Sequence, residues 1–159
     1  MNIYILDENP QISASCLCDE DVELMMEQVA QILACALSQY YDTEETLKYN
    51  NVKNEFHPCV MWTANSKGNY TWLSCHAIEL CAQYLYRFGR MHIFTHDILS
   101  LVSHYDKLPQ GDITPFVQAM PSEYKHITNP IKAYREYYIA ERATKNWKKG
   151  AKIPRWMLN

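Results

Sequence analysis

Apolar residues recur at steps of three and four residues between Leu73 and Phe88, which is the spacing of one face of an α-helix. Asn69 precedes this stripe as a candidate N-cap, and Gly89 follows it as a residue that commonly ends helices. The pattern predicts a long helix with one face in the core. We expect the rest of the chain to pack around it and to complete one pocket. The members of the stripe are Leu73, Ala77, Leu80, Cys81, Tyr84 and Phe88.

A second stripe of helical period predicts another long helix over residues 19–41. The acidic residues Asp19, Glu20 and Asp21 suit the positive end of its dipole. Its expected buried face consists of Val22, Met25, Met26, Val29, Ile32, Leu33, Ala36, Leu37 and Tyr40.

Shorter patterns complete the expected fold. The pair Asn129-Pro130 is a cap followed by a first-turn proline, and Thr114-Pro115 repeats that signal ahead of a short turn over 116–119. Ile3–Leu6 is the one strand-like run. Helical pieces are expected over 10–18, 57–64, 93–105 and 131–148, a turn at 120–124, and a polar loop with one helical turn over 42–54.

These elements predict an all-α fold, a single-domain compact helical bundle over residues 1–159 with a short N-terminal strand-like segment. Residues 146–159 form a basic aromatic tail. The length of 159 residues fits one domain, and 48% hydrophobic with 21% charged residues is ordinary globular composition.

Composition also bears on the compartment. No apolar run approaches the roughly 20 residues that cross a bilayer, so no membrane partner is expected. The start of the chain, Met1–Asp7, lacks the basic and apolar regions of a secretory signal. We therefore expect a cytoplasmic protein whose six cysteines are reduced core thiols.

The net charge of −3 is unevenly distributed. From Asn129 onward the chain has eight basic residues and two acidic ones, Glu136 and Glu141. The net charge of this part is +6, which leaves −9 for residues 1–128. A basic end that also carries Trp147 and Trp156 suits phosphate groups. A solvated helix face followed by a tail explains the same charges equally well.

Metal and cofactor motifs are not found. Cys16-x-Cys18 and His57-x-Cys59 are too closely spaced for structural zinc pairs, and His92 and His96 are not part of a His-Glu-x-x-His motif. The four glycines form neither a phosphate loop nor a dinucleotide fingerprint. We expect no metal and no cofactor. The lack of a phosphate loop and of a dinucleotide fingerprint argues against nucleotide-dependent kinases and dehydrogenases.

The remaining chemistry is that of rings and phosphate-binding groups. Aromatic faces can stack on a base for about 1–3 kcal/mol each, and arginines grip phosphate in bidentate fashion. A core position is the alternative for each aromatic residue. The catalytic candidates, which would polarise, orient or carry protons, are His57, Asn69 and Glu27. The substrate-binding candidates are Gln31, Trp62, Trp72, Tyr86, Arg87, His92, Tyr134, Arg135 and Lys145.

Several motifs carry a resemblance in their order along the chain. The most specific part is His57-Pro58-Cys59-x-x-Trp62 followed by Asn69-Tyr70-x-Trp72-Leu73. Tyr84-x-Tyr86-Arg87-Phe88-Gly89-Arg90-x-His92, Met120-Pro121-x-x-Tyr124-Lys125 and Ala133-Tyr134-Arg135-x-Tyr137-Tyr138 follow. Nearly the whole chain resembles a family of small helical proteins of tailed bacteriophages. That family is linked to the pyrimidine-dimer DNA glycosylase-like and amino acid:DNA transferase group, which hypermodifies thymine.

The resemblance implies a phage protein in the host cytoplasm that acts on a pyrimidine base flipped out of DNA. In the transferase version, activated 5-hydroxymethyluracil loses pyrophosphate and an amine takes its place. Aromatic walls and edge-reading polar groups suit a flipped base, and arginines suit the leaving pyrophosphate. DNA or a phosphorylated nucleotide is therefore the expected partner.

The first long helix departs from the family pattern. Where the family carries Lys-His, a further Lys and a Glu, this chain has Glu20-Asp21, Leu24 and Gln28. If that face is catalytic in the family, this member binds without reacting. The alternative is then a non-catalytic nucleotide-binding protein, such as a phage anti-defence sponge that sequesters a nucleotide immune signal. A helical interaction protein whose histidines and arginines satisfy one another is the third hypothesis, and the sequence leaves the oligomeric state open.

Overall fold

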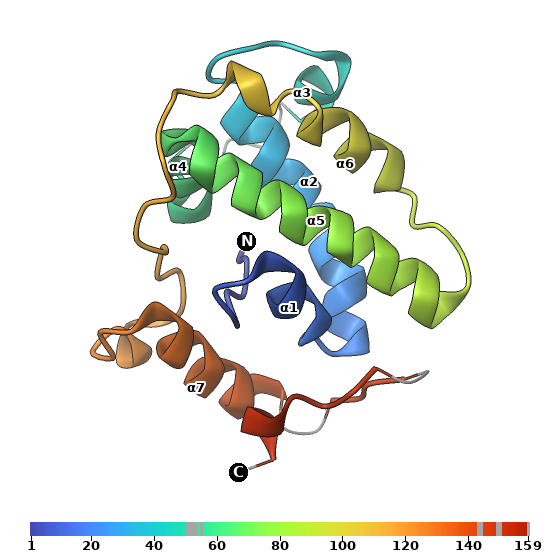
Figure 1. The fold of residues 1–159 in the computed structure, drawn as a ribbon, viewed down its shortest axis with the longest axis vertical. Coiled ribbons are helices and arrows are strands. Elements are labelled where there is room, and N and C mark those ends of the chain that lie inside the picture. Colours follow the sequence, from blue (N-terminus) through green and yellow to red (C-terminus); the bar gives the residue numbers. More distant parts are fainter. Residues whose placement is uncertain (50–53, 55, 143–144, 149–150, 159) are drawn as a thin grey trace.

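The structure is a computed structural model that describes residues 1–49, 54, 56–142, 145–148 and 151–158. Within these ranges all regular structure is helical, which confirms the predicted all-α class (Figure 1). The α-helices are α1 (Pro10–Ser15), α2 (Asp19–Leu37), α3 (Glu44–Tyr49), α4 (Pro58–Asn65), α5 (Lys67–Phe88), α6 (Thr95–Val102) and α7 (Pro130–Arg142). Short 3₁₀ turns are η1 (Tyr105–Lys107), η2 (Ser122–Tyr124) and η3 (Arg155–Met157).

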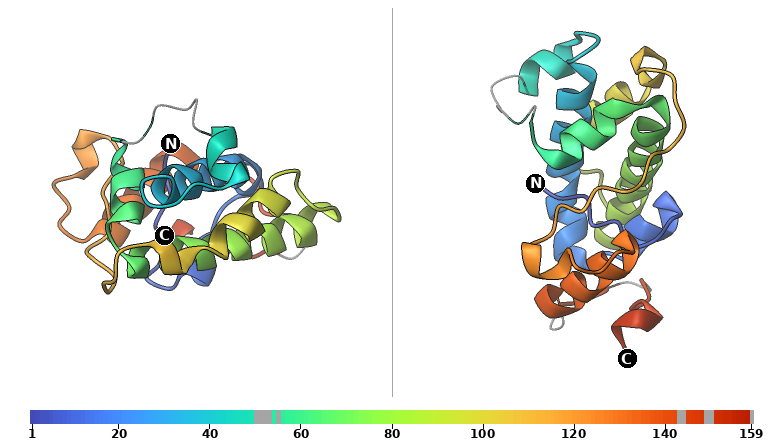
Figure 2. Two further views of the ribbon diagram at one scale, coloured as in Figure 1. Left: turned by 90° about the horizontal axis from the view of Figure 1, so that it is seen from above. Right: turned by 90° about the vertical axis from the view of Figure 1, so that its left-hand side faces the viewer.

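The long helices α2 and α5 pack against each other at the centre of the molecule. Helix α1 packs on α5, while α4 and α6 each contact both long helices. Seen from the side, α3 lies at one end of the molecule, and α7 with the C-terminal turn lies at the other (Figure 2). The predicted central helix is therefore confirmed as the element on which much of the core is built.

Helix α5 begins and ends through different caps. Ser66 is the N-cap, and its hydroxyl accepts from the Asn69 amide at 3.1 Å. The prediction of Asn69 as the cap is wrong, because Asn69 is the third residue of the helix. Gly89 ends the helix as predicted, with a left-handed φ of 69° that glycine adopts without strain.

Helices α2 and α7 are shorter than their apolar patterns predict. Helix α2 begins at Asp19 as expected but ends at Leu37, and α7 ends at Arg142. After α7 the chain turns back to α2: the Asn146 carbonyl accepts from the Asp19 amide at 2.9 Å, and the Trp147 indole donates to the Cys16 carbonyl at 3.0 Å. These contacts hold the tail on the start of α2, a position that a straight helix would not reach.

The N-terminal run Ile3–Leu6 is not a strand, and that prediction is wrong. Tyr4 has a positive φ of 51°, and the Ser13 hydroxyl donates to the Tyr4 carbonyl and accepts from the Leu6 amide. The run is apolar because it is buried on every side, with Ile3, Ile5 and Leu6 fully inaccessible.

Residues 108–121, here called the strap, cross the start of α5 as an irregular extended segment. The Gly68 amide donates to the Gly111 carbonyl at 2.9 Å. A Cβ on Gly68 would lie 2.4 Å from the Asp112 backbone, so only glycine permits this approach. The short turn predicted over 116–119 is wrong, because the strap stays extended and Thr114 hydrogen-bonds to Asn69 of α5.

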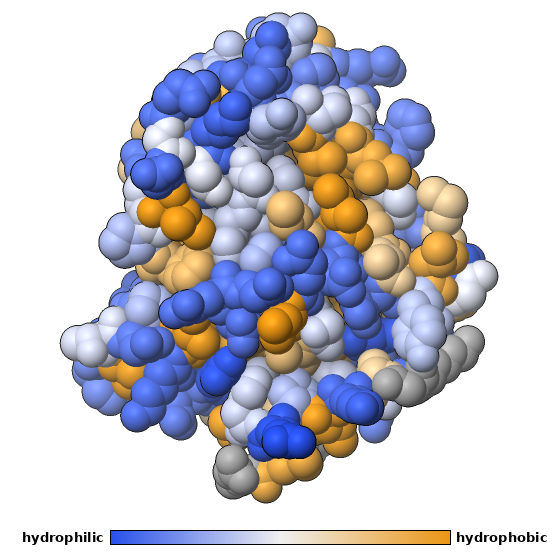
Figure 3. All heavy atoms as spheres, viewed as in Figure 1, coloured by the Kyte–Doolittle hydropathy of each residue, from blue (hydrophilic) through white to orange (hydrophobic). Residues whose placement is uncertain are grey.

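The face seen in Figure 3 is largely hydrophilic, with an apolar patch between α5 and α6. Both helices carry half-exposed apolar side chains, Ile78 and Leu85 on α5 and Leu99 on α6. No helix in the described ranges combines the length and apolar character that spanning a membrane requires. No disulfide joins any of the six cysteines, all of which lie in the described residues, and burial raises the pKa of Cys59 to about 12.

Candidate functional site

The candidate site residues of α5 lie at its two ends. Asn69 and Arg87 are separated by eighteen positions on one continuous helix, or about 27 Å at 1.5 Å per residue. The structure therefore does not bring them into the single pocket that we expected.

Arg87 is 1% exposed, and its hydrogen bonds are made inside the protein. Nη1 donates to the Leu17 carbonyl at 2.7 Å and to Asp19 Oδ1 at 3.2 Å. Nη2 donates to the Ser15 carbonyl at 3.1 Å, and Gln83 Oε1 accepts from both Nε and Nη2. Arg87 thus joins the end of α1 and the start of α2 to α5.

Other candidates around this end of α5 are spread over the surface. Tyr86 is 62% exposed, and Lys145 forms a long ion pair of 3.8 Å with Glu20. The His92 ring packs edge-on to Tyr84, and burial lowers the His92 pKa. A small hollow of about 140 Å³ here is lined by Asp19, Glu20, Glu23, Phe88, Asn146 and Lys148, an acidic surface that does not suit phosphate.

The catalytic candidates are also not brought together. His57 caps α4, where its Nδ1 accepts from the Cys59 amide at 3.2 Å, and burial lowers its pKa. Glu27 is exposed on α2 and accepts from Gln31 Nε2 at 3.1 Å. Asn69 is fully buried on α5. In the described part of the chain, no hydrogen bond or ion pair joins any two of these catalytic candidates.

Two of the positions that depart from the resembled family, Asp21 and Gln28, make structural hydrogen bonds. Asp21 Oδ2 accepts from the Tyr138 hydroxyl at 2.7 Å and from Arg142 Nε at 2.8 Å, which ties α7 to α2. Gln28 Oε1 accepts from the Asn2 amide at 2.9 Å. These side chains stabilise the packing of α7 and of the N-terminal segment on α2.

The start of α5 carries an aromatic cluster. The Trp62 and Trp72 rings lie 6.0 Å apart, and Phe116 of the strap lies 5.9 Å and 5.3 Å from them. The Trp62 indole donates to the Pro115 carbonyl at 3.0 Å, and the Trp72 indole donates to the Glu8 carbonyl at 2.7 Å. Both indoles are buried, so they back the surface and fix the segments above them.

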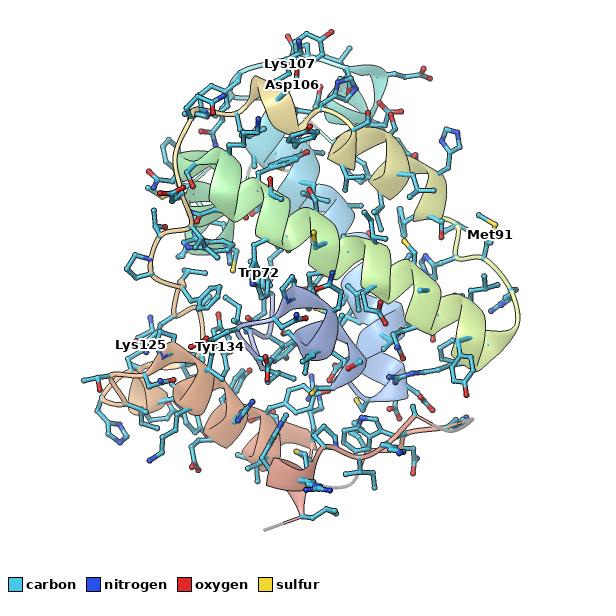
Figure 4. All side chains as sticks on the ribbon, viewed as in Figure 1. Trp72, Met91, Asp106, Lys107, Lys125 and Tyr134 are labelled. Atoms are coloured by element: carbon cyan, nitrogen blue, oxygen red, sulfur yellow. The ribbon has the colours of Figure 1, made fainter. Side chains whose placement is uncertain are left out.

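Asn69 holds the strap against this cluster. Its amide nitrogen donates to the Trp62 carbonyl at 2.7 Å and to the Thr114 hydroxyl at 2.8 Å, and its Oδ1 accepts from the Thr114 amide at 2.8 Å. Tyr134 of α7 anchors the strap farther on, since its hydroxyl accepts from the Ala119 amide at 3.1 Å. Burial raises the Tyr134 pKa. Trp72 and Tyr134 lie in the region between α5 and α7 (Figure 4).

Two adjoining hollows open over these groups, and Glu8 lines both. Together we call them the Glu8 cleft. The apolar half, of about 420 Å³, is lined by Glu8, Ile113, Thr114, Pro115 and Phe116. The charged half, of about 520 Å³, is lined by Asp7, Glu8, Asn129, Ile131, Lys132 and Arg135.

The charged half contains the first turn of α7. Asn129 caps this turn, because its Oδ1 accepts from the Lys132 amide at 2.9 Å, and Pro130 at the first position has no N–H. The Ile131 amide then has no hydrogen-bond partner within the described residues. A free amide at a helix N-terminus, beside the exposed side chain of Lys132, favours an anion.

Arg135 contributes a partly free guanidinium to the same half. Its Nε donates to the Leu6 carbonyl at 2.8 Å, its Nη2 donates to Asp7 Oδ2 at 3.2 Å, and the group lies over the Trp156 ring at 5.3 Å. Nη1 has no partner among the residues that the structure describes. The guanidinium is thus fixed in place with donors to spare.

A buried histidine, which the sequence analysis did not select as a candidate, packs against the aromatic cluster. The His76 ring stacks on Trp72 at 5.3 Å, and its Nδ1 donates to the Pro10 carbonyl at 3.1 Å. Its Nε2 is buried without a hydrogen-bond partner in the described structure. Burial lowers the His76 pKa to about 4, so the ring is neutral near pH 7.

Of the candidates chosen from the sequence, Arg135 lines the Glu8 cleft, while Asn69, Trp62, Trp72 and Tyr134 position its walls. Sequence reasoning missed Glu8, Phe116 and Lys132. The signal for Lys132 was present, because it lies in the first turn of a helix that Asn129-Pro130 had marked.

The described residues contain no group of three or more His, Cys, Asp or Glu side chains arranged to hold a metal ion. Comparison of the chain with known protein families, with curated proteins and with solved structures finds no match.

Proposed function

We propose that the protein binds a phosphorylated nucleoside in the Glu8 cleft and does not transform it. One observation carries the proposal: an apolar hollow backed by aromatic rings adjoins a hollow with spare cationic donors. Volumes of about 420 and 520 Å³ lie within the usual range for small-molecule sites.

The charged half supports a phosphate. Lys132 and Nη1 of Arg135 supply positive donors, and the first turn of α7 adds a free amide with the favourable end of the helix dipole. The carboxylates of Asp7, which pairs with Arg135, and of Glu8 offset this positive charge. The pair of Asp7 with Arg135 also holds the guanidinium in one orientation, so little side-chain entropy is lost when an anion binds.

The apolar half supports a base. Phe116 and Pro115 offer flat apolar surfaces, and the buried Trp62 and Trp72 rings behind Phe116 keep it in position. Stacking of a base on an aromatic side chain contributes about 1–3 kcal/mol and depends little on which base it is. The ligand class therefore follows from the order of groups along the cleft rather than from a base-specific contact.

The geometry favours binding over catalysis. His57, Asn69 and Glu27 lie on three different helices, and the departures at Asp21 and Gln28 serve packing. In the phage setting that the resemblance implies, such a protein would act as a sponge that sequesters a nucleotide immune signal of the host.

Calorimetry with nucleoside 5′-monophosphates tests the proposal. We expect saturable binding that Phe116→Leu weakens about tenfold, because the variant keeps apolar volume but loses the stacking face. The matched control is Phe56→Leu, since Phe56 is 80% exposed and lies outside the cleft. Equal loss in both variants, or no binding by the parent protein, would exclude the cleft as a nucleotide site.

Modification of a flipped pyrimidine in DNA stays a prediction of the resemblance. The ring-backed half of the cleft offers the stacking surface that a flipped base requires. Mass spectrometry of nucleosides from DNA incubated with the protein and phage extract tests this activity. A new modified nucleoside that requires the protein would replace the binding proposal with an enzymatic one.

A further inference from the structure

Glu8 is the residue that lines both halves of the cleft. Its carbonyl accepts from the Trp72 indole at 2.7 Å. The next residue, Asn9, caps α1 by accepting from the amides of Gln11 and Ile12 at 2.9 and 3.0 Å. The main chain of Glu8 is therefore held from both sides.

The Glu8 carboxylate, in contrast, has no hydrogen bond or ion pair with any residue that the structure describes. The other carboxylate of the charged half, that of Asp7, is committed: Oδ2 accepts from Arg135 and Oδ1 accepts from the Asn9 amide at 3.0 Å. Of the two carboxylates that line the cleft, Glu8 is thus the one without a partner in the described residues, and it belongs to both halves.

An ionised carboxylate accepts hydrogen bonds and donates none, so its partner on a ligand must be a donor. In a nucleotide, the sugar lies between base and phosphate. Ribose presents two hydroxyl donors there, whereas 2′-deoxyribose presents one. Acidic side chains recognise ribose hydroxyls in this way in dinucleotide-binding folds.

We infer that Glu8 makes the cleft selective for ribonucleotides over deoxyribonucleotides by accepting hydrogen bonds from the ribose hydroxyls. This inference rests on the proposed nucleotide function and gives it a substrate class. Phe116 binds the base, Glu8 binds the sugar, and Lys132 with Arg135 binds the phosphate.

Calorimetric titration with adenosine and uridine 5′-monophosphates and their 2′-deoxy counterparts tests the inference. The parent protein is expected to bind each ribonucleotide about tenfold more tightly, the loss expected for one hydrogen bond to a charged group. Glu8→Ala is expected to reduce this ratio to about one. The matched control, Glu136→Ala, removes an exposed carboxylate of α7 outside the cleft and is expected to keep the ratio.

Lys132→Ala distinguishes recognition of the phosphate from recognition of the sugar. This variant is expected to weaken the binding of ribonucleotides and deoxyribonucleotides by the same factor. Equal affinities of the parent for the two classes, or a ratio that Glu8→Ala leaves unchanged, would overturn sugar selection while the nucleotide function stands. Failure of every nucleotide to bind would overturn the proposed function itself.

Discussion

Helices α5 and α7 use arginine in opposite ways. At the C-terminal end of α5, Arg87 is buried and donates to the Ser15 and Leu17 carbonyls and to Asp19, all within the protein. On α7, Arg135 is partly exposed, donates one amino group to Asp7 and keeps the other free of partners in the described residues, at the cleft. The residue type alone does not tell whether an arginine stabilises the fold or binds a ligand. The number of its N–H donors that remain free after packing makes that distinction.

Removal of Arg87 gives the largest expected effect. Arg87→Met leaves Asp19 buried without its ion-pair partner and two carbonyls without donors, so we expect a loss of about 3–5 kcal/mol of unfolding free energy. Urea denaturation followed by circular dichroism measures it. Arg135→Met on α7 is the control and is expected to cost about 1 kcal/mol or less, since its pair with Asp7 is about one-third exposed. Similar losses in the two variants would remove the contrast between the two arginines.

Acidification is expected to lower the free energy of unfolding through His76, which stacks on Trp72. Burial lowers the His76 pKa from an ordinary 6.5 to about 4, so between these values the unfolded chain binds a proton that the folded protein does not. The stability contributed by neutral His76 is complete above pH 6.5 and is lost as pH falls toward 4. The total loss is on the order of 3 kcal/mol.

The measurement is the difference in unfolding free energy between the parent protein and His76→Phe from pH 7 to pH 4. Subtraction cancels Asp97 and Glu45, whose lowered pKa values also reduce stability in acid. A difference that does not change with pH would mean that His76 does not resist protonation.

Gly68→Ala tests whether the strap shapes the cleft. The new Cβ would meet the Asp112 backbone at 2.4 Å, so the strap must move away from α5. We expect a loss of about 1–3 kcal/mol and weaker nucleotide binding, because Phe116 and Pro115 belong to the strap. Denaturation and calorimetry on the same sample measure both. The control is Gly111→Ala, where the nearest contact is a side-chain atom of Ser66 at 3.1 Å, and a smaller loss is expected.

The difference between local signals and contacts between distant segments explains what the sequence could and could not predict. The helical period located α2 and α5, and Gly89 and Asn129-Pro130 marked a helix end and a helix start correctly, because these signals are local. Ile3–Leu6 misled, since a run buried on every side has the same apolar pattern as a strand. The role of Arg87 could not be predicted, because two of its acceptors are main-chain carbonyls that no side-chain pattern reveals.

The smallest expected effect on stability comes from Lys132→Ala. Lys132 is exposed, and its side chain has no partner within the described residues, so the unfolding free energy should change by no more than about 0.5 kcal/mol. Binding of a nucleoside monophosphate should nevertheless weaken about tenfold, because a charge-assisted donor to the phosphate is lost. Lys145→Ala is the matched change at the Arg87 end, where the lysine pairs with Glu20 at 3.8 Å. It should leave both stability and affinity nearly unchanged. Equal affinities for the two variants would mean that the phosphate does not bind at the first turn of α7, even if the base occupies the apolar half.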